Sequence, residues 1–163
     1  MVAVVLSLLW RQVPSLRELN RMLARENLLW AKAVKDTVDH KIEGTTDSEH
    51  IFALFLNELA AVDGNWEQAL EATLKTLFKL AKPYGVKVLA NIVISDGNQL
   101  IASRYAIGST PPSLYWLQNA PHFPNSVIIA SEPLFPGNWN PFPESSMICV
   151  GEDLKINMHP IDL

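Results

Sequence analysis

Cysteine is almost absent from this sequence, whose 163 residues include only Cys149. A single cysteine cannot form a disulfide within the chain, and no Cys-x-x-Cys pair or spaced Cys/His set offers a zinc motif. The four histidines, His40, His50, His122 and His159, share no metal-ligand spacing. We therefore predict a protein of a reducing compartment, the cytoplasm, that uses no metal or other cofactor.

An excess of basic residues and a membrane-spanning run are also missing. Thirteen Lys and Arg residues against seventeen Asp and Glu residues give a net charge of −4, so nucleic acid is not an expected partner. The apolar first ten residues are too short to span a bilayer, and they lack the basic start and the cleavage site of a secretory signal. They could form a buried strand, begin a helix, or be a foreign start joined to a domain whose own beginning is missing.

The order of patterns along the chain favours an α+β domain. A capping pattern at Thr46–Glu49 precedes an apolar helix, and Asn65 begins another helix whose apolar residues follow the 3.6-residue period to Ala81. From Val86 on, the pattern is typical of strands, with Asp96-Gly97 as a hairpin turn. Helices followed by strands indicate an antiparallel sheet with helices packed on it.

The second half is expected to contain further strands and one irregular loop. The loop is too rich in proline for a central strand. The expected strands are Leu114–Leu117, Ser126–Ala130, Ser146–Val150 and Leu154–Met158, and the expected loop is Pro133–Pro143.

Asp47 is the candidate binding residue. It would lie in the first turn of the apolar helix, where free backbone N–H groups and the helix dipole favour a carboxylate. A fixed anion at this position could receive the ammonium group of an amino-acid ligand. The alternative is that Asp47 only stabilises the helix, which is a common use of Asp in a first turn.

The segment around Asp47 also carries a resemblance. Gly44–Leu56 resembles the Thr-Asp-Ser-Glu helix of class II glutamine amidotransferase domains, and within them it is most similar to the branch of fungal glutathione breakdown and bacterial ergothioneine synthesis. Asn91–Gly97, Val127–Leu134 and Ser145–Val150 are similar to the same branch in order and spacing.

The resemblance implies a fold and a ligand. Residues 15–163 would form a partial type 2 glutamine amidotransferase domain, while residues 1–14 show no resemblance. The implied fold is that of the N-terminal-nucleophile hydrolases, with two antiparallel sheets between helix layers (αββα), here lacking its first strands. The implied ligand is glutamine or a γ-glutamyl small molecule, whose amino group Asp47 would bind, with Thr46 in the same substrate-binding segment.

The sequence departs from the family at the catalytic groups, so we name no catalytic residue. Family members expose a cysteine at the mature N-terminus whose own amino group is the base, whereas here Val2 follows Met1. An Arg-containing loop and a His-Asn-Gly oxyanion motif are absent upstream of Ser15, and losing one oxyanion donor typically lowers the rate about a hundred- to a thousandfold. Cys149, in an apolar strand-like run, is interpreted as a buried structural thiol. Glutaminase activity is therefore not expected.

Two hypotheses follow. In the first, the chain is a truncated or mis-assembled member of the family, with Asp47 and its helix remaining from the glutamine site. In the second, it is a non-catalytic subunit that docks on a protein partner such as a peptidase. Five aromatic residues could line a pocket wall or serve only the core, namely Trp116, Phe123, Phe135, Trp139 and Phe142.

Overall fold

The computed structural model describes residues 4–6, 47–82 and 87–163, with the backbone alone for residues 4–6 and 47–50. The chain divides into two compact units, one of residues 1–11 and 89–162 and the other of residues 12–88 and 163. The described helices belong to the second unit, and the strands belong to the first apart from Val88. The domain boundary expected between residues 14 and 15 lies outside the described residues.

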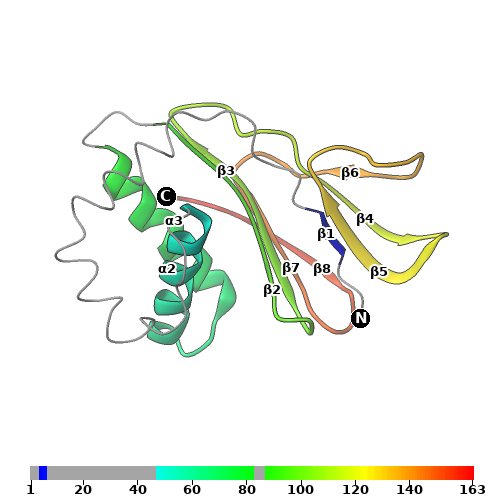
Figure 1. Ribbon diagram of the computed structural model, residues 1–163, viewed down its shortest axis with the longest axis horizontal. Helices are drawn as coiled ribbons and strands as arrows, with labels where there is room; N and C mark the ends of the chain where they lie inside the picture. Colours follow the sequence, from blue (N-terminus) through cyan, green and yellow to red (C-terminus); the bar gives the residue numbers. More distant parts are fainter. Residues whose placement is uncertain (1–3, 7–46, 83–86) are drawn as a thin grey trace. The chain divides into compact units, whose positions relative to one another are not determined.

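Two helices, α2 (Asp47–Ala61) and α3 (Trp66–Ala81), pack against each other as a helical hairpin (Figure 1). The ring of Phe55 on α2 meets that of Trp66 on α3 edge to face, with ring centroids 5.6 Å apart. The apolar side of α3 is largely buried, as its 3.6-residue period predicts, and its buried apolar residues are Ala69, Leu70, Leu74, Leu77 and Ala81.

The connection between the helices is a tight turn followed by the helix start expected at Asn65. Asp63 and Gly64 both have positive φ, at 51° and 82°. Asn65 then caps α3, because its side chain accepts a hydrogen bond of 3.0 Å from the backbone N–H of Gln68. On the exposed side of α3, Lys75 and Glu71 form an i,i+4 ion pair at 2.8 Å.

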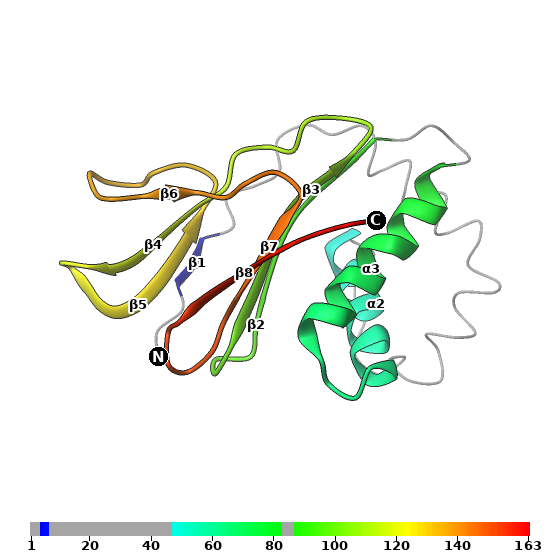
Figure 2. The same cartoon turned by 180° about the vertical axis from the view of Figure 1, so that it is seen from behind.

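The strands form two four-stranded sheets, which we call sheet A and sheet B (Figures 1 and 2). Sheet A has the order β1-β5-β4-β6, and sheet B has the order β2-β3-β7-β8. The strands of sheet A are β1 (Val4–Leu6), β4 (Tyr115–Ala120), β5 (Phe123–Ala130) and β6 (Asn140–Pro141). Those of sheet B are β2 (Val88–Ser95), β3 (Leu100–Ile107), β7 (Ser146–Val150) and β8 (Ile156–Pro160).

A shared apolar core holds the two sheets together. Side chains of both sheets alternate in direction along each strand, so each sheet contributes every second residue to the layer between them. The buried members of this core are Leu100, Ala102, Leu114, Val127, Ile129, Phe142, Ile148 and Val150. The other face of sheet A carries a smaller cluster of Leu117, Ala120 and Ile128, packed against Phe135 and Trp139.

The α+β prediction with two largely antiparallel sheets is confirmed, but two details differ. Val4–Leu6 forms a strand, one of the alternatives for the apolar first residues, but it pairs with β5 in parallel, so sheet A is mixed. The proline-rich segment 133–143 is not wholly a loop, because Asn140 and Pro141 form the short edge strand β6. Proline is compatible with an edge strand, where no ladder partner needs its N–H. The αββα layer order stays a prediction.

Candidate functional site

The predicted binding residue Asp47 is the first residue of α2. The first four N–H groups of a helix have no acceptor within it, and this end of the helix carries the positive end of the dipole. The position therefore favours a carboxylate, as the sequence predicted. The neighbouring Thr46 lies outside the described residues, and of Asp47 itself only the backbone is described.

The body of α2 is anchored well beyond this first turn. Ala53, Leu54 and Phe55 are buried, whereas Phe52 is 48% exposed, so the helix is covered on one side rather than all round. The contact of Phe55 with Trp66 links this buried side to α3. A helix fixed in this way can hold its first turn in a constant position.

Cys149 lies in the middle of β7, far from either end of the sequence. It is paired in register with Ile101 of β3 on one side and with Asn157 of β8 on the other. Its exposure is intermediate, so the thiol is less buried than we expected. A cysteine within a central strand has no terminal amine of its own beside it and cannot act in the way the family's N-terminal nucleophile does.

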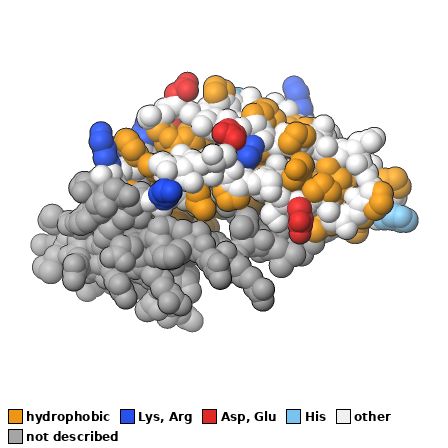
Figure 3. Space-filling model, turned by 90° about the horizontal axis from the view of Figure 1, so that it is seen from above, with side chains coloured by type: hydrophobic (Ala, Val, Ile, Leu, Met, Phe, Trp, Pro, Cys, Tyr) orange, Lys and Arg blue, Asp and Glu red, His pale blue; other side chains and the backbone are white. Residues whose placement is uncertain are grey.

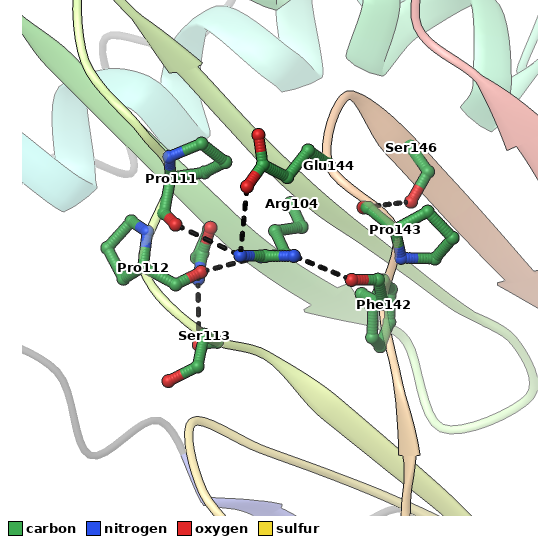
Figure 4. A network of polar contacts seen from close by, with 9 residues as sticks. Arg104, Pro111, Pro112, Ser113, Phe142, Pro143, Glu144 and Ser146 are labelled. Atoms are coloured by element: carbon green, nitrogen blue, oxygen red, sulfur yellow. Dashed lines mark hydrogen bonds and ion pairs between the residues drawn. The ribbon is translucent and has the colours of Figure 1, made fainter.

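A cluster around Arg104 was not predicted from the sequence (Figure 4). The guanidinium of this β3 residue donates to the carbonyl oxygens of Pro112 at 2.7 Å, Phe142 at 2.8 Å and Pro111 at 3.1 Å. From β2, the amide nitrogen of Asn91 donates to the carbonyl of Pro112 as well, at 3.2 Å. The cluster joins the chain before β4 to the chain after β6, which is a structural role.

The five aromatic residues that could line a pocket have different uses. Phe142 is fully buried in the core between the sheets, and Trp139 packs on the outer cluster of sheet A. Trp116 and Phe135 line a cavity of about 420 Å³ beside β4. Phe123 is 41% exposed, with its ring centroid 5.9 Å from that of Phe135. Some of these aromatic residues therefore line a pocket and others serve the core, and the sequence had left both uses open.

The described residues offer neither a metal-binding cluster nor a membrane-spanning helix. Among the residues that it describes, no three His, Cys, Asp or Glu side chains are grouped so that they could hold a metal ion. His122 is exposed in the β4–β5 turn and His159 lies on β8, whereas His40 lies outside the described residues. Within the same part of the chain, no helix is long and apolar enough to cross a membrane. On the face drawn in Figure 3, acidic and basic side chains are scattered singly.

Comparison with known proteins agrees with the resemblance seen in the sequence. The family model described as glutamine amidotransferases class-II matches residues 15–128. The Saccharomyces cerevisiae protein named "Probable glutamine amidotransferase DUG3" is 28% identical over 165 aligned positions, which cover 78% of this chain and 46% of the yeast protein. The chain thus spans about half the length of this curated relative.

A solved structure has the same fold. The glutamine aminotransferase class-II domain protein from Silicibacter pomeroyi superposes with a TM-score of 0.60 at 22% sequence identity. The match covers 91% of this chain and 62% of the bacterial one. At this identity the likeness supports the fold, with its two sheets and two helices, and carries no residue role.

Proposed function

This chain belongs to the class II glutamine amidotransferases, and from that premise we propose that it binds glutamine or a γ-glutamyl amide through Asp47 without hydrolysing it. The observation that carries the proposal is the start of α2 at Asp47, within the segment Gly44–Leu56 that resembles the Thr-Asp-Ser-Glu helix of the family. The matched region of the family model, residues 15–128, includes this segment.

The chemistry of the ligand agrees with this position. The α-ammonium group of glutamine requires an anion, and the free N–H groups and the dipole at a helix start favour an ionised carboxylate. Because α2 is anchored through Phe55 and Trp66, the carboxylate has a fixed base from which to bind. Thr46 directly precedes the helix and completes the proposed binding segment.

The absence of hydrolysis follows from the position of the sulfur. An acyl-enzyme of the family type needs a cysteine whose own α-amino group accepts its proton. Cys149 lies instead in a strand that is paired on both sides. Cys149 therefore has no α-amino group of its own to serve as the base, and we expect no turnover through this thiol.

The test is a calorimetric titration of the purified chain with L-glutamine, alongside Asp47→Ala. Binding by the parent and a loss of at least tenfold in affinity for the variant are expected, because the ammonium would lose its counter-charge. Asp63→Asn is the matched control, since it removes a negative charge just beyond the other end of the same helix. Equal binding by Asp47→Ala, or no binding by any of the three, would remove the assigned role.

The lack of turnover is tested separately by measuring ammonia release from glutamine. None is expected above the background without protein. Release that disappears in Cys149→Ser would show that the thiol does act as a nucleophile and would contradict the proposed inactivity, while leaving the binding role of Asp47 intact.

The finer substrate class rests on the branch that the sequence resembles. Glutathione carries the same γ-glutamyl amino group as glutamine, so Asp47 would bind both in the same way. In the titration, glutathione competing with glutamine for one site supports a link to glutathione catabolism, and a failure to compete removes it.

The cytoplasmic location expected from the single cysteine stays a prediction.

A non-catalytic subunit is the alternative function. This alternative is favoured because the chain has the family fold while its cysteine lies within a strand. A chain without catalytic activity could still serve as a structural subunit. The partner class suggested by the resemblance is a peptidase. Co-purification from the native source checks this alternative, and a chain that is recovered without a stoichiometric partner argues against it.

A further inference from the structure

Strand β4 is longer than the edge strand beside it. β6 pairs only with Tyr115 and Trp116, although β4 continues to Ala120. The N–H of Phe142 donates to the carbonyl of Leu114 at 2.8 Å, which marks the residues of β4 whose backbone faces β6. Hydrogen-bonded pairs recur at every second residue of an antiparallel ladder. The next pair after Trp116 with Asn140 would therefore be Gln118 with Asn138.

The chain before β6 turns away where this next pair would form. The carbonyl oxygen of Asn138 accepts a hydrogen bond from the Asn140 side chain at 3.2 Å, and the indole N–H of Trp139 donates to the carbonyl of Phe135 at 3.0 Å. In Figures 1 and 2 the chain leading into β6 diverges from β4 at this end. By the alternation of the ladder, the backbone N–H and C=O of Gln118 point toward the gap.

Between β4 and the chain that leads into β6 lies a cavity of about 420 Å³. This volume lies within the range of roughly 300–1,000 Å³ found for ligand sites. The residues that line it include four with side-chain amides, Gln118, Asn119, Asn138 and Asn140, and two aromatic residues, Trp116 and Phe135, and none of the lining residues is charged. The site therefore offers hydrogen-bonding groups and aromatic surface to a ligand, with no counter-charge.

We propose that this cavity binds an extended, uncharged peptide segment, which adds to sheet A as the strand that β6 leaves out. A backbone N–H and C=O at strand spacing are the groups that another peptide backbone satisfies, which is how peptides add to an open sheet edge. The part of β4 that pairs with β5 but not with β6, from Gln118 to Ala120, is about 10 Å long at roughly 3.3 Å per residue, so it fits a segment of about three residues. A charged segment would lose its hydration without gaining a partner.

The local structure leaves the Gln118 backbone accessible for such pairing. The side chain of Gln118 is directed to the carbonyl of Leu154, to which its amide nitrogen donates at 2.7 Å. Asn119, with φ of 53°, forms the irregularity between Gln118 and Ala120 and uses its side-chain oxygen to accept from the N–H of Asn125 at 3.1 Å. Neither side chain caps the Gln118 N–H or C=O.

The test is amide chemical-shift mapping of the full chain with the blocked peptide acetyl-Val-Thr-Val-amide as the probe. Saturable shifts centred on Gln118 and Asn138 are expected. The same peptide methylated on its central backbone nitrogen should bind about tenfold more weakly, because it lacks one donor of the ladder. Acetyl-Glu-Thr-Glu-amide should also bind more weakly.

Asn138→Phe is designed to block the exposed rim of the cavity, and it should abolish the shifts. Asn98→Phe, in the exposed β2–β3 turn, is the matched control that should leave them unchanged. Absence of saturable shifts, equal binding of the methylated peptide, or equal binding to Asn138→Phe would each overturn the proposal. Shifts of the same pattern and strength with acetamide alone would assign the cavity to a small amide and would also overturn the peptide assignment.

Discussion

Replacing Arg104 tests how the segments before β4 and after β6 are held. Its side chain is only 16% exposed, and it donates to three backbone carbonyls, those of Pro111, Pro112 and Phe142. Hydrogen bonds from a charged donor contribute about 1.5–3 kcal/mol each, although such contributions are not additive within one network. Removing the guanidinium leaves three carbonyl oxygens without this donor, at about 1–3 kcal/mol for each that stays buried, so about 3–5 kcal/mol is a conservative total. We expect Arg104→Ala to lower the free energy of unfolding by about that amount.

Two further variants distinguish what the several N–H donors of the guanidinium contribute to stability from what its positive charge contributes. Arg104→Lys keeps the charge, but a single ammonium cannot reach three carbonyls arranged around a planar fork, so we expect a loss of about 1.5–3 kcal/mol. The carboxylate of Glu144 lies 3.7 Å from the guanidinium and is 56% exposed. Because an exposed ion pair contributes about 0–1 kcal/mol, Glu144→Gln should cost less than about 1 kcal/mol.

The assay is equilibrium unfolding in urea, followed by circular dichroism and by tryptophan fluorescence. Coincident transitions and an unchanged slope with denaturant show that the comparison concerns stability alone. The reasoning is refuted if Arg104→Lys is as stable as the parent, because a point charge would then suffice. It is equally refuted if Glu144→Gln costs as much as Arg104→Ala, because the ion pair would then dominate.

Two smaller predictions concern a helix cap and a turn. Asn65→Ala should destabilise the chain by about 1 kcal/mol because the N–H of Gln68 loses its acceptor, whereas Asn65→Asp, which keeps one, should melt close to the parent. The pKa of Asp96 lies below its ordinary value of 3.8, chiefly because its carboxylate accepts from the backbone N–H of Gln99 and then of Asn98, both at 2.9 Å. Its contribution to stability is therefore present above the unfolded-state pKa and is lost as the pH falls through the folded-state pKa. The difference in melting temperature between the parent and Asp96→Asn should shrink as the pH is lowered below about 4, and a difference independent of pH would contradict this.

Local patterns in the sequence predicted the local structure well. The Asp96-Gly97 turn, where Gly97 has φ of 94°, the cap at Asn65 and the strand Ser146–Val150 all follow from neighbouring residues. In each case the signal and the structure lie within a few positions of each other. The start of α2 at Asp47 belongs to the same group, because a capping pattern specifies where a helix begins.

Features that join distant residues were not predictable in this way. Nothing in the sequence distinguishes Arg104 from any other charged residue on a strand. One of the carbonyls that accept its hydrogen bonds, that of Phe142, lies 38 positions away. The parallel pairing of Val4–Leu6 with β5 joins residues still further apart, and the two residues of β6 are too few to show an alternating pattern. The gap between Gln118 and Asn138 arises from where β6 ends, so no local motif marks it.

The short edges of sheet A lead to a last prediction, about association. Of the eight residues of β5, only Ile128–Ala130 pair with β1, and β6 pairs with only two of the six residues of β4. Unpaired strand edges invite pairing with another chain, even though Pro124 and the irregularity near Asn119 blunt this hairpin. We expect low stability of the isolated chain and a melting temperature that falls with protein concentration as light scattering rises.

Charge placed at this edge should suppress the association. Phe123→Lys puts an ammonium on the 41% exposed first position of β5, where it would oppose close packing of a second chain at little cost to folding. Phe52→Lys makes the same change at a 48% exposed position of a helix, α2, rather than of a strand, and should leave the concentration dependence as it is. Equal effects of the two variants would assign the association to general surface hydrophobicity. A sharp, concentration-independent melt of the parent well above ambient temperature would show that three residues of β1 and two of β6 protect the edges of sheet A sufficiently.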